Sequence, residues 1–150
     1  MAELLTLQSE SDTDRLASAL ARSISGGQVI GLQGDLGAGK TTLVRLLVGV
    51  LGGQASNVSS PSFTLENEYP VAAGRVVQHW DLYRLQALPA ELLEPPAPTV
   101  IRIVEWPDKM SGYVETLDLI VLIRVMDSGI REVSFAGPLA DSAIEACRKM

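Results

Sequence analysis

The decisive stretch of the chain reads GDLGAGKTT and spans residues 34–42. It fits the pattern G-x-x-x-x-G-K-[ST], in which a glycine-rich turn aims backbone N–H groups at the oxygens of a phosphate. The apolar residues 29–32 precede it, and leucines and valines at helical spacing follow it over residues 43–51. Because a strand, a glycine-rich loop and a helix occur in this order, we predict a phosphate-binding loop whose helix N-terminus attracts anions.

Each part of this loop has a predicted role. Lys40 reaches the β- and γ-phosphates, the hydroxyl of Thr41 binds magnesium, and Thr42 offers a hydroxyl to the α-phosphate. The remaining phosphate contacts come from the backbone of Gly34, Asp35, Leu36, Gly37, Ala38 and Gly39. We therefore expect the chain to bind a nucleoside triphosphate, ATP first of all, together with Mg²⁺.

A second magnesium position calls for a carboxylate at the end of a neighbouring strand. Asp81 follows the strand-like residues 75–80, and Glu105 follows the strand-like residues 100–104. Glu105 is slightly favoured because its strand is the more apolar, although Arg102 interrupts it. For either carboxylate the alternative is a helix cap or a surface ion pair, so the residues alone leave both open.

The rest of the chain predicts one α/β domain over residues 1–150. Further strands are expected at residues 4–7, 63–69, 75–80, 99–105, 117–125 and 131–135, and helices after Ser11 or Asp12 and after Pro138. Two of the strand pairs read as hairpins, which makes part of the sheet antiparallel. Residues 85–93 read as helical or irregular, and the proline-rich residues 94–98 as a linking loop.

Composition narrows the possible partners and compartments. A net charge of −6 disfavours tight nucleic-acid binding by this chain alone, since such binding depends on Lys and Arg. Cys147 is the only cysteine, so no intrachain disulfide forms; we read it as a small apolar residue of a terminal helix. With no signal-like N-terminus and no long apolar run, the sequence predicts a cytoplasmic protein that spans no membrane.

Several other residues have two readings each. His79, the only histidine, is read as a hydrogen-bonded structural residue in preference to a catalyst. Trp106 either shapes the site or belongs to the core. The hydroxyl cluster of Ser59, Ser60, Ser62 and Thr64 is either a nucleotide-sensing switch loop or an ordinary solvated loop.

Four segments together resemble the TsaE family of bacterial ATPases for tRNA threonylcarbamoyladenosine biosynthesis, over roughly residues 10–137. They read GDLGAGKTTLVR (34–45), SSPSFTLENEY (59–69), HWDLYRL (79–85) and VEWPDK (104–109). The resemblance implies a P-loop NTPase-like three-layer fold with a mixed parallel and antiparallel sheet. It also implies ATP hydrolysis that is weak alone, partnership with the TsaB and TsaD proteins, and contact with tRNA only through that complex.

The resemblance also assigns residues. It makes Lys40 and Thr41 the phosphate and magnesium residues, with Glu105 as the second magnesium carboxylate. It places Asp81 near the γ-phosphate, where it orients water. Further implied residues are Thr13 and Arg131 at the nucleotide base, and Ser60, Ser62, Thr64, Arg84 and Trp106 as switch or partner-coupling residues.

The chain departs from the family pattern in its short, proline-rich residues 94–98 and in Arg102, where an apolar residue is expected. The first departure bears on partner contacts more than on nucleotide chemistry. Two rival classes remain. A small-molecule kinase is disfavoured by the two hairpins and the scarcity of clustered arginines, and a nucleotide-binding module without turnover is separable only by assay.

Overall fold

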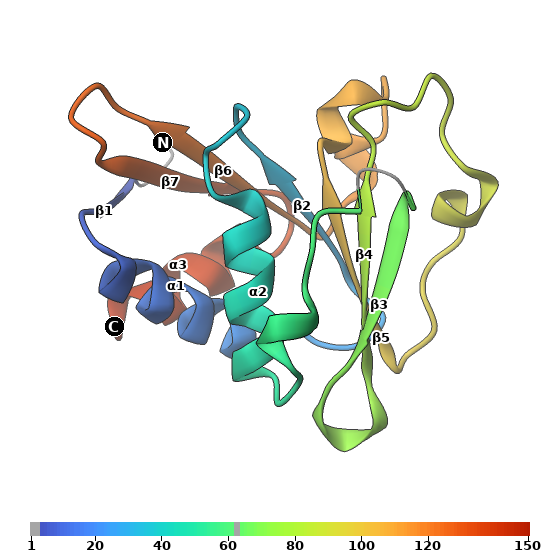
Figure 1. Cartoon of the computed structure of the whole chain (residues 1–150), viewed down its shortest axis with the longest axis horizontal. Coiled ribbons are helices and arrows are strands. Elements are labelled where there is room, and N and C mark those ends of the chain that lie inside the picture. Colours follow the sequence, from blue (N-terminus) through green and yellow to red (C-terminus); the bar gives the residue numbers. More distant parts are fainter. Residues whose placement is uncertain (1–3, 62–63) are drawn as a thin grey trace.

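The computed structural model describes residues 4–61 and 64–150, and within them seven strands form one sheet in the order β1-β7-β6-β2-β5-β4-β3 (Figure 1). The strands are β1 (Leu5–Leu7), β2 (Val29–Gln33), β3 (Glu66–Pro70), β4 (Val76–Asp81), β5 (Val100–Glu105), β6 (Leu119–Val125) and β7 (Arg131–Ala136). The α-helices of these residues are α1 (Glu10–Ser23), α2 (Lys40–Val50) and α3 (Ala140–Arg148).

The sheet is mixed, as the sequence predicts. Strands β6, β2, β5 and β4 run parallel to one another, whereas the pairs β1–β7, β6–β7 and β3–β4 are antiparallel. Both predicted hairpins are therefore confirmed. Strand β3 begins at Glu66, later than the predicted residue 63, and Ser62 and Phe63 lie outside the described residues.

The register of the parallel strands brings their carboxyl ends to one edge of the sheet. Asp81 on β4 pairs with Glu105 on β5, and Glu105 pairs in turn with Leu32 on β2. Strand β2 then leads directly into the glycine-rich loop and α2. In open α/β sheets, ligands bind at this edge.

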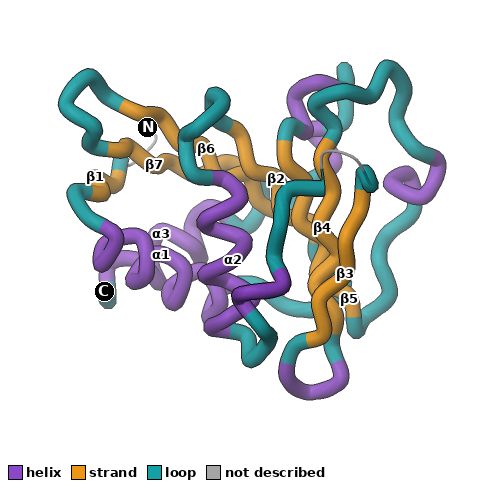
Figure 2. The backbone as a smooth tube through the Cα atoms, in the orientation of Figure 1, coloured by secondary structure: helices purple, strands orange, loops and turns teal. Residues whose placement is uncertain are grey.

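The two faces of the sheet are covered differently. All three α-helices share one apolar core with side chains such as Ile30, Ile103 and Val121. On the other face, Trp80, Val104 and Ile120 pack with side chains from residues 82–92 and 110–117. These segments on either side of β5 are loops and 3₁₀ turns (Figure 2). Among the described residues, no α-helix covers this second face.

The irregular second cover has a physical cause in the sequence. Prolines at residues 95, 96 and 98 remove backbone donors, so a helix has no means of continuing there. Residues 90–93 form one 3₁₀ turn, so of the two readings of residues 85–93 the irregular one is closer to the structure. Arg102 is buried beneath this segment, and its Nη1 donates to the Glu94 carbonyl at 2.7 Å while its Nε donates to Gln78 Oε1 at 2.7 Å.

Helix boundaries follow the expected signals with one correction. Ser9 caps α1, its hydroxyl accepting from the Asp12 N–H, so the helix begins before the predicted Ser11 or Asp12 cap. Cys147 is buried on α3, as its apolar reading predicts. None of the helices in residues 4–61 and 64–150 combines the length and apolar character needed to cross a lipid bilayer.

Candidate functional site

The glycine-rich loop joins β2 to α2 and depends on its glycines. Gly39 has φ of 105°, a left-handed conformation that side chains rarely adopt, and it stands directly before the first residue of α2. Gly34 approaches the neighbouring strand so closely that a Cβ would lie 2.6 Å from the Ile123 carbonyl oxygen. These positions explain why the loop admits only glycine at its two ends.

Lys40 lies inside the curve of this loop and is only 5% exposed. Its Nζ donates to the carbonyl oxygens of Gly34 and, at 3.0 Å, of Asp35. The ammonium also lies 4.1 Å from the ring centroid of Trp106, a cation–π contact. Burial lowers the pKa of Lys40, while the nearby carboxylates of Glu105 and Asp81 oppose that shift.

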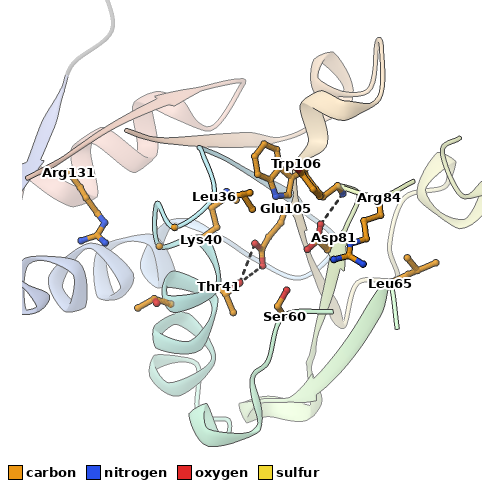
Figure 3. Close-up of a pocket in the computed structure, with 14 residues that line it drawn as sticks. Leu36, Lys40, Thr41, Ser60, Leu65, Asp81, Arg84, Glu105, Trp106 and Arg131 are labelled. Carbon is orange, nitrogen blue, oxygen red and sulfur yellow. Dashed lines mark hydrogen bonds between the residues drawn. The ribbon is translucent and has the colours of Figure 1, made fainter. Parts of the chain in front are cut away.

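Glu105 faces the first turn of α2. The Thr41 hydroxyl lies 3.0 Å from Glu105 Oε2 and 3.3 Å from Oε1, and it donates to this carboxylate (Figure 3). The side chain is 3% exposed. The two residues predicted to share a metal are therefore in direct contact, although they lie 64 positions apart in the chain.

Asp81 is the second buried carboxylate at this edge. Its Oδ1 accepts the Tyr83 N–H at 2.9 Å, which fixes the side chain beside the loop. Burial is the main cause that raises the pKa of Asp81, and the negative charge of Glu105 adds to it. Asp81 is thus a desolvated carboxylate with one oxygen held by the backbone.

A cavity of about 420 Å³ opens between the loop and the two carboxylates. Most of the predicted site residues line it, together with Leu65 and Tyr83, which sequence reasoning missed. The lining consists of Leu36, Gly37, Gly39, Lys40, Thr41, Thr42, Ser60, Leu65, Asp81, Tyr83, Arg84, Glu105, Trp106 and Arg131 (Figure 3).

The other predicted residues lie around this cavity. Thr13 and Ala38 line an adjoining hollow of about 230 Å³, which shares Gly39, Thr42 and Arg131 with the first. Arg131 braces the loop between the two, because its Nε donates to the Ala38 carbonyl at 2.8 Å.

Three predicted residues do not face either hollow. Gly34 and Asp35 line a separate depression that includes Trp106. Thr64 turns toward β3, where its hydroxyl donates to Asn67 Oδ1 at 2.9 Å. Ser62, the remaining member of the predicted switch cluster, lies outside the described residues.

Trp106 occupies a strained position between Glu105 and Pro107. Its φ of 60° is left-handed, which is uncommon for a bulky side chain. The ring packs at 4.8 Å from the ring of Tyr83, and both stand beside the cavity. Strain of this kind is typical of functional sites, so Trp106 is better described as shaping the site than as plain core.

His79 extends the site into the core. It is fully buried on β4, as the structural reading predicts, and its Nε2 lies 2.6 Å from Glu105 Oε2. Its Nδ1 lies 3.1 Å from the hydroxyl of Tyr69, which also contacts Ser59. The sequence signal for this position of His79 is strand alternation, because residues two apart, such as His79 and Asp81, point to the same side of β4.

The oxygen ligands present suit magnesium. Mg²⁺ is usually held by one or two protein oxygen ligands while water and substrate phosphates complete its shell. Thr41 and Glu105 supply such a pair. Within residues 4–61 and 64–150, no group of three or more His, Cys, Asp or Glu is placed to hold a metal ion by itself.

Comparison with known proteins gives a consistent result. The family model described as "Threonylcarbamoyl adenosine biosynthesis protein TsaE" matches residues 7–133. The Aquifex aeolicus protein named tRNA threonylcarbamoyladenosine biosynthesis protein TsaE is 39% identical over 129 residues, which are 85% of this chain and 90% of that one. The Rickettsia felis protein of the same name is 30% identical over 94% of this chain and 84% of its own length.

A solved structure shares the fold. The crystal structure of YdiB from Bacillus subtilis superposes with a TM-score of 0.68 at 25% sequence identity, and the match covers 99% of this chain and 97% of that one. The family model spans most of the chain, and the relatives named above match along most of their own length. This chain therefore belongs to the TsaE family, whose members are named for the biosynthesis of threonylcarbamoyladenosine in tRNA.

Proposed function

We propose that this protein is a P-loop, magnesium-dependent ATPase that acts with TsaB and TsaD in the threonylcarbamoyladenosine modification of tRNA. The observation that carries the proposal is a single cavity bounded by the glycine-rich loop on one side and by Asp81 and Glu105 on the other. A phosphate-binding loop and two buried carboxylates are the parts that phosphoryl transfer to water requires.

The loop side would hold the triphosphate. Lys40 is directed inward by the carbonyls of Gly34 and Asp35, and phosphate oxygens would compete with them for its ammonium. The backbone N–H groups at the start of α2 would add further donors to the phosphates. Arg131 would keep the loop in this shape through its bond to the Ala38 carbonyl.

The carboxylate side would serve the metal and the water. Thr41 and Glu105 would hold Mg²⁺, which when bound would neutralise charge that develops on the β–γ bridge. Asp81 would accept a hydrogen bond from the attacking water, since its side chain is already fixed by the Tyr83 N–H. Glu105, and not Asp81, contacts Thr41. We therefore assign Glu105 to the metal and Asp81 to the water.

Partner dependence has its own support. Leu36 is 71% exposed at the cavity rim and Tyr83 is 39% exposed beside it, so the open site carries apolar surface. Such surface is suited to contact with another protein. With a net charge of −6, the chain would reach tRNA through TsaB and TsaD in the cytoplasm, and not by itself.

The test measures phosphate release by the purified protein alone and then with purified TsaB and TsaD from the same source. We expect slow release alone, faster release with both partners, and co-elution in gel filtration that differs between ATP and ADP. The Lys40→Ala variant is the control for contaminating ATPases. Absence of co-elution with either nucleotide, together with an unchanged rate, would remove the tRNA-modification role and leave an ATPase. Absence of release under all conditions would remove the ATPase as well.

A further inference from the structure

The candidate site continues inward through a buried row of polar side chains that the proposed chemistry does not use. Glu105 Oε2 lies 2.6 Å from His79 Nε2, and His79 Nδ1 lies 3.1 Å from the Tyr69 hydroxyl. The same hydroxyl lies 3.1 Å from the Ser59 carbonyl oxygen and accepts the Ser59 N–H at 3.4 Å. The row therefore runs from the carboxylate beside Thr41 to the backbone next to Ser60.

Burying these polar side chains in the core carries a desolvation cost. His79 is 0% exposed and Tyr69 is 4% exposed, and their neighbours on the same face include Val77, Ile101 and Ile103. Buried polar side chains are costly unless every partner is satisfied, and apolar side chains would fill this space at no such risk. Because each polar atom of His79 and Tyr69 has a partner, the row fixes these side chains in one arrangement.

The pattern of donors and acceptors makes the row directional. An ionised Glu105 only accepts, so Nε2 of His79 must carry the hydrogen that it receives. The Tyr69 hydroxyl then has one hydrogen to place, with His79 Nδ1 and the Ser59 carbonyl as its two acceptors. The hydrogen of the Tyr69 hydroxyl is therefore shared between a ring that contacts Glu105 and the backbone of Ser59.

Further hydrogen bonds connect Ser59 and Leu65 to the neighbouring strands. Asn67 on β3 donates from Nδ2 to the Ser59 carbonyl at 3.3 Å. At the other end, the Asp81 N–H donates to the Leu65 carbonyl at 3.1 Å. Ser60, between these ties, lines the cavity. Ser59 and Leu65 are therefore tied to β3 and β4, and β4 carries both Asp81 and His79.

We propose that His79 and Tyr69 are positioning residues that connect Glu105 to Ser59, so that the placement of the carboxylate and the conformation of the backbone at Ser59 are set together. The inference rests on the proposed magnesium-dependent function of Glu105. Under this proposal, a displacement of Glu105 is transmitted through His79 and Tyr69 to the backbone of Ser59, beside Ser60. The strands of the sheet do not have to move.

The first measurement is the Mg²⁺ concentration at half-saturation for binding a non-hydrolysable ATP analogue. Partners that orient a metal ligand contribute about 10- to 100-fold to metal affinity, so we expect His79→Asn to raise the midpoint about tenfold or more. His79→Gln places an amide nitrogen where Nε2 stands, and it should restore most of that loss. Tyr69→Phe, which does not touch Glu105, should raise the midpoint about threefold.

The second measurement needs neither nucleotide nor metal. His79 is the only histidine, so in a chain prepared without a histidine tag the ring nitrogens of ¹⁵N-labelled histidine give unambiguous NMR signals. We expect Tyr69→Phe to shift the Nδ1 signal and Glu105→Gln to shift the Nε2 signal. The backbone amide signal of Ser59 should shift in Glu105→Gln as well, although the two residues share no direct contact.

Tyr113→Phe is the matched control. Tyr113 is also a buried tyrosine, but among the described residues its hydroxyl has no hydrogen-bond partner. It packs with Trp80 and Val104 on the opposite face of the sheet. This variant should leave the magnesium midpoint, the imidazole signals and the Ser59 amide unchanged. Any shared effect of both tyrosine variants would point to general core disturbance and would overturn the proposal.

The possible results test the positioning role of His79 and Tyr69 separately from the proposed function. An unchanged magnesium midpoint in Tyr69→Phe, or equal effects of His79→Gln and His79→Asn, would overturn the positioning role. An unshifted Ser59 amide in Glu105→Gln would overturn the connection to the loop. If the wild-type chain bound the analogue without any need for Mg²⁺, the proposed function would fail, whereas the connection would still be decided by the NMR signals.

Discussion

The two sides of the candidate site are built in different ways. On the loop side, Lys40 contacts the Gly34 carbonyl only six positions away, within one continuous turn. On the carboxylate side, Glu105 meets Thr41 across 64 positions and His79 across 26. The first side is a local structure that the backbone imposes, whereas the second exists only because three strands are paired in one register.

Because of this difference, substitutions on the two sides should have different consequences for binding and stability. A change on the loop side should remove a proposed phosphate contact and leave the sheet intact. A change on the carboxylate side disturbs groups that are buried together, so binding, metal dependence and stability become linked. Five substitutions test that contrast.

Lys40→Ala should have the largest effect. It removes a charged donor to phosphate, and we expect the affinity for a non-hydrolysable ATP analogue to fall about 100-fold. Calorimetric titration measures it. Lys109→Ala is the control, because Lys109, like Lys40, lies over the Trp106 ring but is outside the loop. Equal losses in both variants would show that general charge, and not the loop, holds the nucleotide.

Glu105→Ala and Asp81→Ala should separate metal from water. Loss of Glu105 removes a charged ligand, and we expect the Mg²⁺ midpoint of hydrolysis to rise about 10- to 100-fold. Loss of Asp81 should lower kcat by about 100-fold with nucleotide affinity less affected. Magnesium titrations of both variants decide the assignment. A shifted midpoint in Asp81→Ala with none in Glu105→Ala would reverse it.

Asp81→Asn should stabilise the protein while it slows hydrolysis. Burial raises the pKa of Asp81, so its charged form is disfavoured in the fold. The penalty is absent at pH below the ordinary pKa and grows as pH rises through the raised value, so the gain should be about 1 kcal/mol at pH 8 and vanish near pH 3. Urea unfolding at both pH values measures it, and a loss of stability at pH 8 would contradict the burial argument.

Glu66→Gln should have the smallest effect and no effect on nucleotide binding. Burial first, and then the neighbouring Glu68 and Glu91, raise the pKa of Glu66 to about 7. The folded state therefore holds this proton more tightly than the unfolded state, and stability falls as pH rises from about 4.5 to about 7. The variant should lack that part of the pH profile. A profile identical to the wild type would show that Glu66 does not titrate in this range.

Much of the loop side could be predicted from sequence because its signal is local. The strand, the glycine-rich turn and the helix after it are adjacent in the chain, and Gly39 marks the start of α2. The carboxylate side was harder. The choice between Asp81 and Glu105 stayed open on residues alone, since only strand register shows that Thr41 faces Glu105.

The residues that sequence reasoning missed share one cause. Tyr69, Leu65 and Tyr83 lie inside the quoted family-like segments, but their residue types predict no role there, and they reach the site through tertiary contacts. His79 was correctly read as buried and hydrogen-bonded, but its partner depends on the pairing of β4 with β5. The irregular cover of residues 82–117 was likewise foreseeable only in part, as a proline-rich loop of undefined path.

Arg102 gives the two departures from the family pattern a common explanation. Its guanidinium fastens the Glu94 carbonyl at the start of the proline-rich segment to Gln78 on β4. A short segment that lacks backbone donors would otherwise have little to hold it against the sheet. The arginine and the short loop therefore form one structural unit, and we expect each to be lost or gained together with the other among related sequences.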